Sequence, residues 1–72
     1  MTDVSVNKEL LNIVKSSAFP NDVRVGAAQG LGYSAGAEER KALIDVAKSS
    51  SYPNDVRAAA AKAAGHATQR LI

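Results

Sequence analysis

The sequence predicts an all-α fold, in which two helical hairpins with four helices are stacked as a fragment of an α-solenoid. Three observations predict it: a block of about 33 residues occurs twice, the composition favours helices, and both copies carry the same helix breakers and helix starts. Because the two copies account for almost the whole chain, we expect a single domain over 1–72, with units at about 3–35 and 36–68.

The repeat is clearest around the two prolines of the chain. Residues 15–24 read KSSAFPNDVR and residues 48–57 read KSSSYPNDVR, so the second copy follows the first at an offset of 33 residues. The match continues on both sides, in pairs such as Leu10 with Leu43, Ala28 with Ala61 and Gly32 with Gly65. A repeat of this length is typical of helical arrays in which each unit buries its apolar face against the next one.

Composition supports helices and argues against several classes of function. Aromatic residues make up only 4% of the chain, which favours helices packed on small side chains. The absence of cysteine excludes disulfides and thiolate metal sites, and the single histidine, His66, lacks the partners that a catalytic or metal site needs. We therefore expect no enzyme activity, no catalytic residue, no metal and no cofactor. The sequence shows no signal peptide and no apolar run that could span a bilayer, so we expect a cytoplasmic protein that does not act in membranes.

Each unit contains two predicted helices joined by a short turn. The first helix, over about 4–17 and again over 37–50, has apolar residues at the i, i+1 and i+4 positions of one helical face. Those positions are Leu10, Leu11 and Val14 in the first unit, and Leu43, Ile44 and Ala47 in the second. Asp3 and Gly36 are the predicted start positions, and Pro20 and Pro53 prevent each helix from continuing.

The second helix of each unit is predicted to begin at Asn21 and at Asn54, because asparagine is a favourable N-cap. An aspartate follows in each first turn, where the helix dipole favours negative charge. Gly32 and Gly65 are expected either to cap the carboxyl ends of these helices or to let a neighbouring helix approach closely. Phe19 and its counterpart Tyr52 either fill the gap between helices or form an exposed ridge.

Two stacked units leave both ends of the stack uncovered, whereas about three units are usual for a stable array. Apolar residues lie near both ends of the chain, among them Val6, Leu71 and Ile72. Two interpretations stay open: these residues pack on the core of the domain itself, or they form a homodimer contact through an open end.

Both units resemble HEAT-like repeats of the type found in phycobilisome lyases and related proteins. The residues that carry the resemblance are Asn21-Asp22-Val23-Arg24 with Ala27, Ala28 and Gly32, and Asn54-Asp55-Val56-Arg57 with Ala60, Ala61 and Gly65. The proline precedes the asparagine here, whereas the family pattern has aspartate followed by proline, and Ala64 replaces the leucine expected before the last glycine. The resemblance implies a helical-repeat fold, and a fold of this kind does not fix function.

The resemblance also implies roles for two sets of residues. Asp22, Arg24, Asp55 and Arg57 would form a ladder of charge-assisted hydrogen bonds between adjacent repeats. The helices over about 4–17 and 37–50 would line the concave surface of the stack, with their two rows of polar residues roughly 8–10 Å apart. Those rows are Lys8, Asn12 and Lys15, and Lys41, Asp45 and Lys48. They are the candidate partner-binding residues, although an ordinary solvated face explains them as well.

The leading functional prediction is a non-enzymatic protein–protein interaction or scaffold module that binds another protein. Acidic groups on this partner would pair with the lysines of the module. One alternative is a helical repeat that binds nucleic acid through a basic face, although the net charge of +2 is small for this purpose. The other is an accessory fragment of a HEAT-repeat lyase.

Overall fold

The structure is a computed structural model that describes residues 4–69 of the 72-residue chain. It contains four α-helices, and no strand occurs within the described residues. The helices are α1 (Val4–Lys15), α2 (Asn21–Ser34), α3 (Ala37–Lys48) and α4 (Asn54–Gln69). The predicted all-α fold with four helices is confirmed. Asp3, Leu71 and Ile72, to which the sequence assigned a helix start and an apolar tip, lie outside the described residues.

The turns inside the two hairpins have the same construction. After α1 the Ser16 hydroxyl accepts a hydrogen bond from the Ala18 amide (3.1 Å), and after α3 the Ser49 hydroxyl accepts one from the Ser51 amide (3.2 Å). Each chain segment then runs through a proline into the next helix. The identical KSS and PNDV segments therefore produce the same turn twice, as the repeat predicts.

Two details of the helix ends differ from the sequence-based prediction. Pro20, not Asn21, occupies the cap position of α2, in an extended conformation, and no side chain caps this helix end. One first-turn amide of each helix donates to an aspartate: the Val23 amide to Asp22 and the Val56 amide to Asp55, both at 2.9 Å. The carbonyl oxygens of Pro20 and Pro53 also accept amides of these first turns. Proline suits this place because its fixed φ angle and missing N–H are compatible with a helix start.

The glycines of α2 and α4 do not end their helices, because α2 continues past Gly32 to Ser34 and α4 continues past Gly65 to Gln69. Their predicted role as carboxyl caps is therefore wrong. Close approach is confirmed at the first of them, since a Cβ atom added to Gly32 would lie 3.4 Å from the Ala63 Cα atom on α4.

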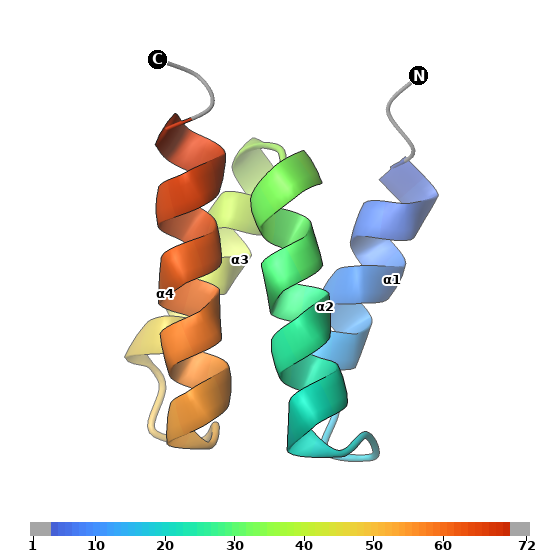
Figure 1. Cartoon of the computed structure of the whole chain (residues 1–72), viewed down its shortest axis with the longest axis vertical. Helices are drawn as coiled ribbons and strands as arrows, with labels where there is room; N and C mark the ends of the chain where they lie inside the picture. The colour runs from blue at the N-terminus through green and yellow to red at the C-terminus, as the bar shows by residue number, and fades with distance from the viewer. Residues whose placement is uncertain (1–3, 70–72) are drawn as a thin grey trace.

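The four helices pack as two hairpins, α1 with α2 and α3 with α4, which meet mainly through α2 and α4. Figure 1 shows α2 between α1 and α4, with α3 behind them. Alanine and glycine on the facing sides let α2 and α4 pack closely along their length, whereas α1 and α3 have few contacts with each other. The closely packed layer is therefore α2 and α4. That α1 and α3 line a concave surface remains a prediction.

The core lies between the hairpins and is built largely of alanine. Its largest fully buried side chains are Leu31, Leu43, Val14 and Val56. Around them lie eight buried alanines, with Leu10, Leu11 and Tyr52 partly buried at the edge. None of the four described helices has the length and apolar character that crossing a lipid bilayer requires.

Candidate functional site

The repeated arginines hold the hairpins together. Arg24 is 5% exposed, and its Nε donates to the carbonyl oxygen of Val14 in the last turn of α1 (3.0 Å). Its guanidinium also lies 5.6 Å from the centre of the Tyr52 ring. Arg57 repeats the first contact, donating from Nε to the carbonyl oxygen of Ala47 in the last turn of α3 (3.0 Å). Carbonyls at this end of a helix have no partner within the helix, so a cation there is favourable.

This geometry corrects the predicted ladder between repeats. Arg24 and Arg57 each donate to a carbonyl of the preceding helix in their own unit, and the side chains of Asp22 and Asp55 accept amides of their own helices. Within residues 4–69 these contacts take the place of aspartate–arginine pairs between units. The four residues therefore build each hairpin. The signal for this role was an arginine nine residues after the last residue of the preceding helix, in both units.

All six candidate partner-binding residues are exposed, as predicted from their spacing. They are Lys8, Asn12, Lys15, Lys41, Asp45 and Lys48. A hollow of about 250 Å³ lies between α1 and α3, and Lys15 and Asp45 line it from opposite sides. Lys41 lines a different hollow, between α3 and α4. The two rows are thus ridges on neighbouring helices with a hollow between them, and their role in binding remains a prediction.

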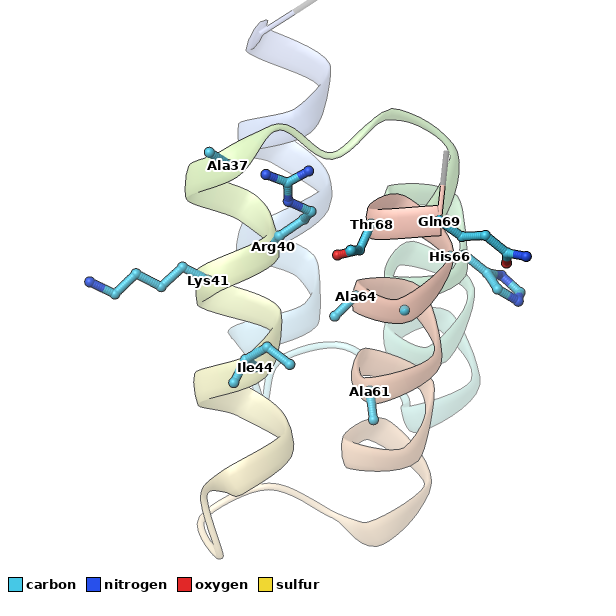
Figure 2. A pocket seen from close by; sticks show the side chains of 10 residues that line it. Ala37, Arg40, Lys41, Ile44, Ala61, Ala64, His66, Thr68 and Gln69 are labelled. Carbon is cyan, nitrogen blue, oxygen red and sulfur yellow. The ribbon is translucent and has the colours of Figure 1, made fainter. Parts of the chain in front are cut away.

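A hollow with a volume of about 830 Å³ lies on the outer side of the α3–α4 hairpin. Ile44 on α3 points towards α4, and Ala64 and Thr68 on α4 point towards α3 (Figure 2). Ala61 on α4 also lines the hollow. Ile44 is 44% exposed, although the sequence placed it on a buried apolar face. It is exposed because the first hairpin packs on the other side of α3 and α4, and within residues 4–69 no further helix covers this side.

The edge of this hollow is cationic. Arg40 and Lys41 on α3 contribute to its lining, and Lys41 extends away from α4 into solvent (Figure 2). His66 and Gln69 also contribute to the lining, but their side chains project from the far side of α4. The exposed His66 instead borders a second hollow of about 420 Å³ together with Gly32, Tyr33 and Gln69. The arrangement offers apolar contact and positive charge to a ligand.

The described residues contain no group of three or more histidine, cysteine, aspartate or glutamate side chains placed to hold a metal ion.

Phe19 and Tyr52, which occupy equivalent turn positions, have different environments. Tyr52 is packed against the core and lies over Arg24, whereas Phe19 is 42% exposed. Tyr52 thus fits the predicted packing between helices, whereas an exposed ridge at Phe19 remains a prediction.

No family model, no curated protein and no solved structure matches the chain. The HEAT-like resemblance therefore rests on the repeated residues themselves.

Proposed function

We propose that the protein is a non-enzymatic interaction module of two HEAT-like repeats, which binds another protein on the outer surface of the α3–α4 hairpin. The observation that supports this proposal is the exposed Ile44, which lies in a hollow of about 830 Å³ beside Ala61 and Ala64. An exposed apolar patch with a polar edge is typical of protein-binding surfaces. A cytoplasmic location forms part of the proposal.

The charges around the hollow indicate the chemistry of the partner. Arg40 and Lys41 line it from α3, and the chain as a whole carries a formal net charge of +2. Complementary charges at the edge of an interface increase the association rate and the specificity more than the affinity. We therefore expect a partner with an apolar side chain that contacts Ile44 and acidic side chains beside it.

The test uses the full 72-residue chain, immobilised as wild type and as the Ile44→Asp variant. Proteins that wild type retains from a native lysate and Ile44→Asp does not are identified, purified and titrated calorimetrically. We expect the variant to lose at least about tenfold in affinity, which corresponds to about 1.4 kcal/mol. Binding of the purified partner to both proteins with equal affinity would contradict the proposed site.

Two controls separate the hollow from other surfaces. Val6→Asp places the same charge at an apolar residue of α1 that is 48% exposed, close to the exposure of Ile44, and should leave binding unchanged. A charge reversal of Lys8, Lys15 and Lys48 tests the lysine rows separately. If this reversal abolishes binding and Ile44→Asp does not, the partner binds on the α1–α3 side.

A further inference from the structure

The packing of the two hairpins against each other provides a template for the surfaces that remain open. We call this packing the inner interface. A shift of 33 residues carries α1 onto α3 and α2 onto α4. One side of the first hairpin packs against the second hairpin. After the same shift, this side corresponds to the outer, open side of the second hairpin. Each residue of the inner interface therefore has a counterpart at one end of the stack.

At the carboxyl end of the stack, residues that would be buried by a following hairpin are open. Ala28 is fully buried in the inner interface, whereas its counterpart Ala61 is exposed and lines the α3–α4 hollow. Leu11 packs partly buried against the core, and its counterpart is the exposed Ile44. We call the surface formed by Ile44, Ala61 and Gly65, with the buried Ala64 beneath them, the carboxyl end face.

At the amino end the complementary set of residues is open. Val56 is fully buried where α4 meets the first hairpin, whereas its counterpart Val23 is 44% exposed on α2. Tyr52 packs on the core over Arg24, and its counterpart is the exposed Phe19. We call the surface formed by Phe19, Val23, Gly26 and Gly30 the amino end face. Three of the exposed large apolar residues, Phe19, Val23 and Ile44, are thus counterparts of residues packed in or beside the core.

A glycine inside α4 supports the same relation. Glycine is less favourable than alanine in a helix interior, so its presence there often reflects close approach of another backbone. At Gly32 the reason is visible, because an added Cβ atom would lie 3.4 Å from Ala63 Cα and 3.6 Å from His66 Cβ. At the equivalent Gly65 an added Cβ atom meets nothing within 4 Å, although α4 continues to Gln69.

We infer that the carboxyl end face of one copy of this chain binds the amino end face of a second copy, in the geometry of the inner interface. In this arrangement Val23 of the second copy occupies the place that Val56 has within one chain. Phe19 of the second copy lies over Arg57 of the first copy, in the way that Tyr52 lies over Arg24 within one chain. The α2 helix of the second copy approaches Gly65 through Gly30, the counterpart of Ala63. The inference rests on the proposed function, because it names the partner of the same α3–α4 surface.

The two surfaces in this contact are different, so it is heterologous and leaves one free end of each kind on every assembly. Successive copies therefore extend the stack as concentration rises. The contact is also weaker than the inner interface, because Gly26 and Gly30 carry less apolar surface than their counterparts Ala59 and Ala63. We expect association in the range of about 10 µM to 1 mM.

The test blocks one end at a time with the same residue. Val23→Glu closes the amino end face and Ala61→Glu closes the carboxyl end face, both at positions that are exposed in one copy. Ser50→Glu, in the exposed turn between α3 and α4, is the matched control. Circular dichroism at low concentration checks that all three variants keep the helical content of wild type. Sedimentation equilibrium then measures mass for each variant alone and for the two blocked variants mixed in equal amounts.

Wild type and Ser50→Glu are expected to grow in mass with concentration, and each blocked variant alone to stay at the 7.5 kDa of one chain. The mixture is expected to reach twice that mass and stop, because only one open pair of faces remains. A blocked variant that still self-associates, or a mixture that stays monomeric, would overturn the head-to-tail contact. Wild type that stays monomeric to about 1 mM would overturn self-association, while capture of a different protein sensitive to Ile44→Asp would leave the proposed function intact.

Discussion

The two units share a ten-residue segment that differs at only two positions, yet the same residues have different environments in them. Valine follows the Asn-Asp pair in both units, and it is 44% exposed in the first unit as Val23 but fully buried in the second as Val56. The aromatic residue before each proline shows the same contrast, exposed as Phe19 and packed on the core as Tyr52. The position of a unit in the stack therefore determines which of its side chains are buried. The local sequence determines where its helices and turns form. Four predictions test this comparison.

The largest effect is expected at the equivalent leucines of α1 and α3. Leu43 is fully buried, and we expect Leu43→Ala to lower the free energy of unfolding by about 2–5 kcal/mol, because it removes transfer energy and leaves a cavity. Leu10 is only partly buried, so Leu10→Ala should cost clearly less. Urea denaturation of both variants measures the difference. Equal losses of unfolding free energy would show that the two leucines contribute equally to stability, which would contradict the difference between the units.

The valine pair should give the next largest difference. Val56→Ala removes two buried carbon atoms, so it should cost about 2 kcal/mol, while Val23→Ala should stay within about 0.5 kcal/mol of wild type. The measurement is the midpoint of urea unfolding at low protein concentration. A cost at Val23 as large as that at Val56 would mean that the outer side of α2 is covered even in the isolated chain.

The arginine pair tests the contacts inside the hairpins. Arg24→Leu should lower the free energy of unfolding by about 1–3 kcal/mol, because it leaves the buried carbonyl of Val14 without its partner. Arg57→Leu should cost less, since Arg57 is more exposed and water can reach the Ala47 carbonyl. Thermal unfolding followed by circular dichroism compares them. If Arg24→Leu unfolds at the wild-type temperature, the carbonyl contact does not stabilise the hairpin.

The smallest effect, of opposite sign, is expected at the paired glycines. Gly65→Ala should stabilise the isolated chain by roughly 0.5–1 kcal/mol, because the methyl group enters open space in a helix interior. Gly32→Ala should gain clearly less, since its methyl group meets the backbone of α4 at 3.4 Å. Differential scanning calorimetry at low concentration compares the two variants. A larger gain at Gly32 than at Gly65 would show that the α2–α4 packing is looser than the structure describes.

Much of the fold follows from the sequence, because the repeat, the prolines and the Asn-Asp pairs are local signals. The starts of α2 and α4 at Asn21 and Asn54 agree with these signals. Gly32 was less clear, because glycine in a sequence indicates a helix end and a close helix contact equally well, and only packing against α4 distinguishes them. The same limit applies to Arg24, whose partner is a backbone carbonyl that sequence patterns do not reveal.

The candidate site was the hardest part to predict. The sequence correctly placed the lysine rows on exposed positions, and it placed Ile44 on an apolar helix face with Leu43. It did not show that Leu43 lies in the core and Ile44 in an open hollow, because both fit the same helical pattern. That distinction depends on which side of a hairpin is covered by its neighbour.

The central claim is that the two end faces meet as the inner interface does, and a crosslink tests it most directly. The inner contact places a Cβ atom at position 32 about 3.6 Å from His66 Cβ, which is within disulfide range, and the chain has no cysteine of its own. The equivalent pair between copies is Gly65 and Tyr33. Gly65→Cys and Tyr33→Cys, carried on chains of different tag length, are mixed in a glutathione buffer.

The head-to-tail contact predicts that the mixed disulfide dimer forms in clear excess over either dimer of identical chains. The double variant Gly32→Cys with His66→Cys is the control, and it should form an internal disulfide. If the control closes and the mixed chains crosslink only in statistical proportions, or do not crosslink, the proposed contact between copies is contradicted.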